Sequence, residues 1–201
     1  MIEFWRFMGP GSDYGPILDG RYDPLLVIVS ILVATVAAYA GLAVVGRIEA
    51  ESVGRRMWIV IGATVMGGGV WAMHFIGMLA YSLPVPVTFG LWLTVLSAPP
   101  SILGSGVALA VLSRSSISRR DLHVGGLLMG LGIGGMHYVG MEAMQTDAVL
   151  RYDATLFFVS IGVAYVLATT ALHVRTLAGR RNGSAEVWPG IVSAPVMGSA
   201  V

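Results

Sequence analysis

The most regular feature of the chain is a series of long apolar segments separated by short polar ones. Most hold about 20 residues or more, enough to cross roughly 30 Å of hydrocarbon as a helix that rises about 1.5 Å per residue. Helix is the expected form, because lipid offers no partners for the backbone groups of an open strand. Pro99 and Pro100 fall inside one segment and predict a kink or a local break there. The predicted helices are 25–45, 57–81, 91–112, 122–144 and 155–174, with a partial sixth at 188–201.

The composition agrees with lipid as the main solvent. The chain is 56% hydrophobic and only 11% charged, with a mean hydropathy of +0.79, whereas a soluble domain is about one quarter charged. The predicted fold is therefore an all-α membrane protein, a polytopic bundle of transmembrane helices. A net charge of +1 provides no basic face for nucleic acid. The chain has no cysteine, which excludes disulfides, thiolate-bound clusters and cysteine-based zinc sites.

The arginines are concentrated in alternate connections between the predicted helices. Short basic loops stay in the cytoplasm, and the connection 82–90 contains no basic residue. We therefore expect 1–24 to be an extracytoplasmic N-terminal segment, and helices two and four to end at the outer face. Because 1–24 lacks a basic start followed by an apolar run, the first helix is expected to be retained rather than cleaved as a leader. The basic connections carry Arg47, Arg55 and Arg56, then Arg114, Arg119 and Arg120, then Arg175, Arg180 and Arg181.

An internal repeat organises the chain. Residues 65–78 match residues 128–141 without a gap, at an offset of 63 positions, and both segments contain a Met-His pair. A third copy begins near Tyr152, and its second half starts at 196–198. The predicted domain, 25–201, is thus a bundle built from a repeated pair of helices. The chain stops before a third Met-His pair would fall, so we expect it to be a truncated copy of a longer protein.

The repeated motif places candidate metal ligands on one face of each helix. In both units a histidine precedes a methionine by four positions, so the two side chains share a helical face. Both motifs lie in the last turns before the expected outer surface, and neighbouring glycines allow close helix contact in lipid. In helix four the stripe includes a further methionine at i+7. The predicted ligands are His74, Met78, His137 and Met141, with Met73, Met136 and Met144 in second place.

The chemistry of this set indicates copper. Imidazole and thioether form a soft, neutral ligand set that suits Cu(I), whereas Mg²⁺ and Ca²⁺ require oxygen. Zinc prefers Cys, His and carboxylate, and Glu142 points off the His137 face. The structural alternative is that each histidine bonds to a neighbouring helix and locks the bundle. His123 and His173 stand at the expected cytoplasmic helix ends, where dipole and headgroup contacts explain them.

The motif resembles that of the MHYT family of bacterial membrane sensor domains, which is named for Met-His-Tyr-Thr. Residues 136–139 match three of its four letters and residues 73–76 match two, and the similarity covers most of 22–201. The resemblance implies a domain of the bacterial plasma (inner) membrane with three motifs near the outer face. It also implies copper binding and, through copper, sensing of oxygen, carbon monoxide or nitric oxide. Tyr138 is then expected to hydrogen-bond a metal-bound gas or a ligating imidazole.

The chain departs from the family pattern in three respects. The threonine of the motif is Ile76 in one unit and Val139 in the other. We also expect the chain to lack the third motif and a cytoplasmic output domain. Larger family members are fused to cyclic-dinucleotide enzymes or other signalling modules. A domain of this kind standing alone is therefore expected to signal through a separate output protein.

The predicted function is a copper-binding membrane sensor domain without catalysis, because no nucleophile is paired with a base. Two other functions stay open. A metal transporter would need polar or methionine positions along a pore, but the inner halves of helices two and four hold mainly glycine and aliphatic residues. A haem electron carrier is permitted, since His74 and His137 lie at similar depth and could be axial ligands. A bundle without any ligand is the remaining alternative.

Overall fold

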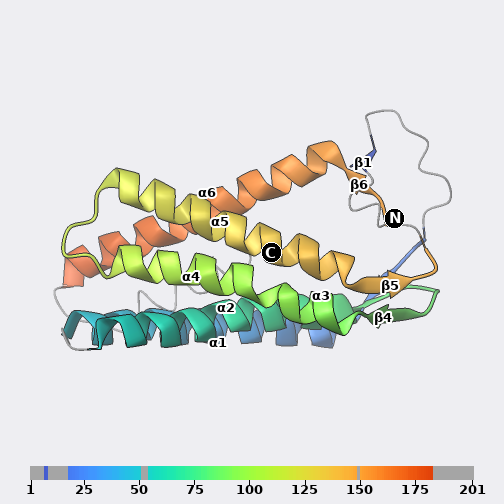
Figure 1. The fold of residues 1–201 in the computed structure, drawn as a ribbon, viewed down its shortest axis with the longest axis horizontal. Helices are drawn as coiled ribbons and strands as arrows, with labels where there is room; N and C mark the ends of the chain where they lie inside the picture. Colours follow the sequence, from blue (N-terminus) through green and yellow to red (C-terminus); the bar gives the residue numbers. More distant parts are fainter. Residues whose placement is uncertain (1–6, 9–17, 51–53, 149, 183–201) are drawn as a thin grey trace.

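The fold is an elongated bundle of helices that run along its long axis (Figure 1). A computed structural model describes residues 7–8, 18–50, 54–148 and 150–182. The predicted partial helix at 188–201 lies outside these residues. The helices are α1 (Pro24–Ala50), α2 (Arg55–Ala80), α3 (Leu91–Leu96), α4 (Ala98–Leu112), α5 (Arg119–Glu142) and α6 (Ala154–Asn182). The strands are β1 (Phe7–Met8), β2 (Arg21–Tyr22), β3 (Tyr81–Ser82), β4 (Val87–Phe89), β5 (Met144–Thr146) and β6 (Tyr152–Asp153).

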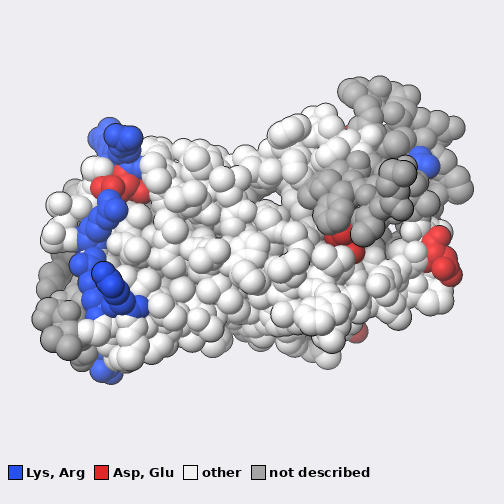
Figure 2. Space-filling view, viewed as in Figure 1, with Lys and Arg blue, Asp and Glu red and all other residues white. Residues whose placement is uncertain are grey.

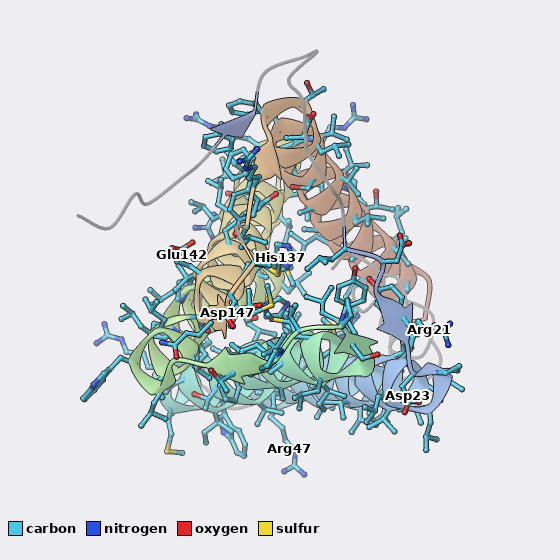
Figure 3. The ribbon with its side chains drawn as sticks, turned by 90° about the vertical axis from the view of Figure 1, so that its right-hand side faces the viewer. Arg21, Asp23, Arg47, His137, Glu142 and Asp147 are labelled. Atoms are coloured by element: carbon cyan, nitrogen blue, oxygen red, sulfur yellow. The ribbon has the colours of Figure 1, made fainter. Side chains whose placement is uncertain are left out.

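Five spans of the described chain are long and apolar enough to cross a membrane, with α3 and α4 together forming one of them. This confirms the predicted all-α membrane fold. The helices follow one another around the bundle in the order α1, α2, α4, α5 and α6, each packed against the next (Figures 1 and 3). Helices α2 and α5 stop at Ala80 and Glu142, short of the predicted ends at 81 and 144, and the residues that follow pair as strands. Helices α1 and α6 continue to Ala50 and Asn182, past the predicted ends at 45 and 174.

The third span is broken where the sequence predicted. Ser97 separates α3 from α4, and Pro99 and Pro100 occupy the first turn of α4. Proline lacks a backbone N–H and cannot continue a helix from the preceding turn, but it is accommodated in a first turn, where that N–H has no helical partner. The prolines therefore begin a new helix, and the break falls on the residues just before them.

Helix α5 begins three residues earlier than predicted because Ser118 caps it. The Ser118 hydroxyl accepts a hydrogen bond from the Asp121 backbone N–H at 3.1 Å, and the Asp121 carboxylate accepts one from the Ser118 N–H at 3.0 Å. Asp121 also forms an ion pair with Arg114. This reciprocal pair is a capping box, which satisfies two N–H groups that the helix itself cannot.

Replacing Ser118 with Ala is expected to lower the melting temperature of the detergent-solubilised protein by about 2–4 °C, because an N-terminal N–H loses its acceptor. Thermal unfolding followed by circular dichroism measures the change. Ser116→Ala in the same connection is the control, since Ser116 is exposed and lies outside the cap. Equal melting temperatures for the two variants would contradict the importance of the cap.

The two repeat units close in the same way at one end of the bundle. In the first unit β2 pairs antiparallel with β3, and the Asp23 N–H donates to the Ala80 carbonyl at 2.8 Å. In the second unit β4 pairs antiparallel with β5, and the Gly90 N–H donates to the Ala143 carbonyl, also at 2.8 Å. The repeat found in the sequence is therefore a repeat of structure. We call this end of the bundle, where β2–β5 lie, the motif end.

Glycines set how closely the helices of the two units approach. A Cβ on Gly67 of α2 would lie 2.5 Å from the Ile102 Cα of α4, and a Cβ on Gly130 of α5 would lie 3.0 Å from the Tyr165 Cα of α6. Neither site has room for a side chain, because backbone lies directly opposite. This supports the expectation that the glycines serve helix packing in lipid.

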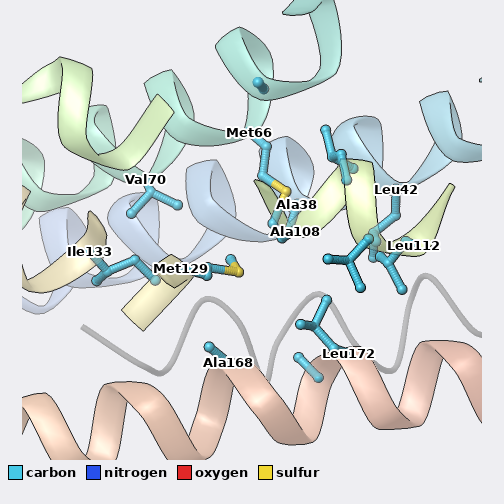
Figure 4. Packing of buried hydrophobic residues seen from close by; sticks show 14 of the residues in the cluster. Ala38, Leu42, Met66, Val70, Ala108, Leu112, Met129, Ile133, Ala168 and Leu172 are labelled. Atoms are coloured by element: carbon cyan, nitrogen blue, oxygen red, sulfur yellow. The ribbon is translucent and has the colours of Figure 1, made fainter. Parts of the chain in front are cut away.

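Buried apolar side chains fill the space between the helices, while large apolar side chains cover the outside of the spans. Met66, Leu109, Met129, Met136 and Leu172 are fully buried members of one continuous cluster, part of which is drawn in Figure 4. Arginine side chains gather at the end opposite the motif end, on the left in Figure 2. We call this the arginine end, which comprises Arg47, Arg55, Arg56, Arg114, Arg119 and Arg120.

Candidate metal centre

The histidines of the two repeated motifs meet inside the bundle. His74 lies six residues before the end of α2 and His137 five residues before the end of α5, so both sit roughly 8–9 Å inside the motif end. Their ring centroids are 4.9 Å apart, with an interplanar angle of 67°. His74 is only 5% exposed. Figure 3 shows His137 on the inner side of the helices, where it faces the bundle interior.

One nitrogen on each ring is buried without a hydrogen-bond partner among the described residues. These atoms are His74 Nε2 and His137 Nδ1. A buried polar atom left unpaired costs about 1–3 kcal/mol, and a hydrogen bond to a neighbouring helix, the structural alternative, is absent at both atoms in the described part of the chain. Two imidazoles that share one ion, with metal–nitrogen distances of about 2 Å, have ring centroids roughly 5–6 Å apart. The observed spacing therefore fits a shared metal ion.

The methionines of the motif divide into two groups. Met73 and Met136 are buried in the central apolar cluster, with 6% and 0% exposure. Met78 and Met141 lie one turn beyond the histidines and are half-buried. Both residues thus lie between the histidines and the motif end along their helices, and their ligation stays a prediction.

The predicted helical position of Met144 was wrong. Helix α5 ends at Glu142, and Met144 is the first residue of β5, where it pairs with Phe89 of β4. The helix stops because the Ala143 carbonyl accepts its hydrogen bond from the Gly90 N–H, which belongs to a different segment of the chain. Met144 therefore remains at the motif end but does not continue the stripe of His137 and Met141.

Gly140 provides the space that the His74 ring occupies. A Cβ at Gly140 would lie 2.5 Å from His74 Nε2 and 2.8 Å from its Cδ2. Gly77, the equivalent residue of the first unit, has no atom within 4 Å of the same hypothetical Cβ. The sequence showed a glycine three positions after each histidine, but not that only one of the two seats an imidazole. Gly140 is thus a site residue that the sequence reasoning missed.

Aromatic rings surround the imidazole pair. The ring centroid of Phe75 lies 5.2 Å from that of His74, and the ring centroid of Tyr138 lies 5.0 Å from that of His137. Phe75 also contacts Phe89 of β4, with ring centroids 5.8 Å apart. These rings pack against the two histidines and make their surroundings more apolar, which strengthens any electrostatic or coordination contact formed there.

The hydroxyl of Tyr138 is directed away from the histidines. It is hydrogen-bonded to the Ser160 hydroxyl of α6 at 2.6 Å, while its ring packs edge-on against His137. In this arrangement Tyr138 fixes the position of the His137 ring by packing. The expected hydrogen bond to a ligating imidazole is not the contact formed here, and a bond to a bound gas stays a prediction.

Carboxylates contribute little to the centre. The described residues contain no group of three or more His, Cys, Asp or Glu side chains placed to hold a metal ion. Glu142 points outward from α5 in Figure 3, as the sequence predicted from its position on the helix. Further ligation of an ion at the paired histidines by the motif thioethers, which would favour a soft metal, stays a prediction.

Tyr152 lies at the motif end, between the spans that end at Glu142 and begin at Ala154. Burial is the main reason that the pKa of Tyr152 rises to about 12, and the negative charge of Glu142 and then Tyr138 add to the effect. In the unfolded chain the phenol ionises near pH 10. The folded state therefore keeps a proton that the unfolded state loses, and stability falls as the pH rises between these two values.

The Tyr152→Phe variant is accordingly expected to lose less stability than the wild type between about pH 9 and about pH 12. The melting temperatures of both proteins, followed across this range in the same detergent, measure the difference. Identical pH dependence in the two proteins would show that Tyr152 ionises as readily in the folded state as in the unfolded state.

Comparison with known protein families matches most of the chain. The MHYT model, described as a bacterial signalling protein N terminal repeat, matches residues 15–58, 67–125 and 130–189. The matched residues include both His74 and His137, and the third match extends over α6. No solved structure matches the chain.

Curated relatives are signalling proteins much longer than this chain. The bifunctional diguanylate cyclase/cyclic di-GMP phosphodiesterase MucR of Pseudomonas aeruginosa is 38% identical over 79% of the chain, and the cyclic di-GMP phosphodiesterase NbdA of the same species is 36% identical over 88%. The signaling protein YkoW of Bacillus subtilis is 30% identical over 90%. In each case the match spans 23% of the relative's length. With its repeated Met-His units and its five apolar spans, the chain belongs to the MHYT family of bacterial membrane signalling domains.

Proposed function

We propose that this domain is a sensor that binds copper at the motif end, with His74 and His137 as its central ligands. The observation that carries the proposal is the pair of imidazoles 4.9 Å apart, each with a buried nitrogen that lacks a partner in the described chain. Met78 and Met141 complete a soft, neutral ligand set, with Met73, Met136 and Met144 nearby. Copper bound there would supply an open coordination position for oxygen, carbon monoxide or nitric oxide.

The residues around the ligands prepare the site for such an ion. Gly140 leaves room for the His74 ring, and Phe75 and Tyr138 pack against the two imidazoles. Phe89 of β4 packs against Phe75 in turn. Because these groups hold both rings in place, the two histidines are ordered by the fold before an ion binds.

The activities that the Pseudomonas relatives are named for belong to those proteins, of which this chain matches 23%. We propose that this domain performs no catalysis itself and passes its signal to an output protein or domain. The arginine end faces the cytoplasm in this proposal, since basic connections stay on that side. The motif end and the N-terminus then lie outside the plasma membrane, where the site meets dissolved gas.

Packing favours a binding site over a transport path. Directly along the bundle from the histidines, Met66, Leu109 and Met129 are each at most 1% exposed and belong to one continuous apolar cluster. A transporter requires polar or thioether positions that continue through such a region. The contact between the two rings also disfavours haem, because axial imidazoles lie on opposite faces of a macrocycle.

Metal analysis of the full chain tests the proposal. Protein purified in detergent from cells supplied with copper is expected to contain copper, to lack the Soret band of haem, and to change its copper-dependent spectrum when carbon monoxide is added. A protein without copper after this treatment contradicts the proposal. A Soret band favours the haem carrier, and faster copper uptake by cells that make the protein favours the transporter.

A further inference from the structure

A second pair of histidines meets at the arginine end. His123 of α5 and His173 of α6 have ring centroids 5.7 Å apart, at an interplanar angle of 64°. The two residues are 50 positions apart in the sequence. From the sequence, each was interpreted separately as a histidine at a cytoplasmic helix end. His123 lies 14 residues before His137 on the same helix, which places the two pairs about 20 Å apart along α5. The second pair is therefore spatially distinct from the candidate metal centre.

The internal repeat allows the packing of α5 against α6 to be compared with an equivalent helix contact in the same chain. The contact between α5 and α6 corresponds to the contact between α2 and α4. Gly130 meets Tyr165 just as Gly67 meets Ile102, with both partners 63 positions further along. A second contact keeps the same register, because Gly126 meets Thr169 and Gly106 meets Ala63.

In this register, polar residues of α5 and α6 correspond to apolar residues of α2 and α4. At the equivalent positions α2 and α4 carry aliphatic side chains, one of them exposed, where α5 and α6 carry two imidazoles and a phenol. Helix packing alone does not require the polar groups, so their presence in one unit needs another explanation. His123, Tyr165 and His173 correspond to Val60, Ile102 and Ala110.

In both His123 and His173, the ring nitrogen Nδ1 forms a hydrogen bond. His173 Nδ1 lies 2.9 Å from the Thr169 carbonyl oxygen, which can only accept, so Nδ1 carries the proton. A neutral His173 then presents Nε2 as a lone pair. His123 Nδ1 is hydrogen-bonded to the Tyr165 hydroxyl at 2.8 Å. When His123 donates its Nδ1–H to the Tyr165 hydroxyl, its Nε2 is also left as a lone pair, which is the orientation of histidines that bind metals.

We propose that His123 and His173 form a second cation site that links α5 to α6 at the arginine end. The set lacks a thioether, so it suits a borderline divalent ion such as Zn²⁺ better than Cu(I), with water filling the other positions. Two imidazoles on one ion have ring centroids roughly 5–6 Å apart, which includes the observed 5.7 Å. Tyr165 is a positioning residue that orients His123. The site is independent of the proposed copper centre, because the two share no residue.

Zinc titration of the full chain in detergent tests this site. The parent protein carries His74→Ala and His137→Ala, so that the motif end contributes no imidazole. It is expected to bind one Zn²⁺ per chain in competition with a chromogenic chelator. His123→Val and His173→Ala reproduce the residues of the equivalent contact, Val60 and Ala110, and each is expected to weaken zinc binding at least tenfold. The proposal is overturned if the parent binds no zinc, or if either variant binds zinc as tightly as the parent does.

Two further measurements separate zinc binding from structural effects. Tyr165→Phe is expected to weaken zinc binding about tenfold while the melting temperature without zinc stays close to that of the parent. A fall in melting temperature with unchanged zinc affinity would assign Tyr165 a packing role instead. If the parent unfolds, the same substitutions in the otherwise unaltered chain must lower the zinc stoichiometry by one, and an unchanged stoichiometry there also overturns the site.

Discussion

The His74→Ala/His137→Ala double variant is expected to lose its bound copper, with affinity reduced more than a hundredfold. The loss of a single residue that only supports a ligand already weakens metal binding about 10–100-fold, and this variant removes both central donors. The two imidazoles come from different helices and meet at a ring-centroid distance of 4.9 Å. No described His, Asp or Glu side chain completes a three-residue group around them. Little would therefore replace them.

The comparison must be made with Cu(I) under a reductant, because a thioether-free imidazole pair competes more effectively for Cu(II). His123→Val/His173→Ala is the matched control, since it also removes two histidines from a helix–helix contact but leaves the motif end intact. That control should retain its copper. Copper lost equally from both double variants would indicate general destabilisation, and copper retained after the loss of His74 and His137 would remove the proposed ligands.

Folding should tolerate the double variant. Each alanine removes an imidazole whose buried nitrogen lacks a partner in the described chain, so no hydrogen bond at that atom is broken. The free energy of unfolding is expected to fall only because packing contacts of the two rings are lost. Part of this loss is offset, because two buried polar atoms without a partner are removed. Melting temperatures without copper check this, and only variants that melt cooperatively enter the copper comparison.

Gly140→Ala is expected to weaken copper binding at least tenfold, whereas Gly77→Ala should leave it unchanged. The two glycines occupy the same position of the repeat, 63 residues apart. A Cβ at residue 140 would lie 2.5 Å from His74 Nε2, so the ring must move, while a Cβ at residue 77 meets no atom within 4 Å. Displacement of a ligand by about 1 Å is enough to spoil a preorganised site.

Copper affinity and apo-protein melting temperature, measured for both variants, distinguish displacement of the ligand from unfolding. Gly77→Ala should be neutral or slightly stabilising, since alanine favours a helix by about 0.5–1 kcal/mol over glycine. In a His74→Ala background, Gly140→Ala should have no further effect on copper, because the ring it displaces is gone. Equal copper affinity in Gly140→Ala and the wild type would show that His74 is not held against Gly140.

Much of the architecture was determined by the sequence alone. An apolar segment of about 20 residues in lipid has to form a helix, because its backbone groups find partners only within the segment. Pro99 and Pro100 predicted the break in the third span for an equally local reason, the missing backbone N–H. The repeat of 63 positions likewise predicted that His74 and His137 lie at one depth, since equal spacing from equivalent helix ends requires it.

The tertiary structure decided what depends on segments far apart in the chain. Met144 is not helical because its backbone pairs with β4, which lies more than 50 residues earlier in the chain. The Tyr138 hydroxyl bonds to Ser160 of the next helix, and Gly140 differs from Gly77 only through the ring packed against it. His123 and His173 meet because of the register between α5 and α6. Local patterns fix helices and their faces, but contacts across the bundle follow from packing, which no single segment encodes.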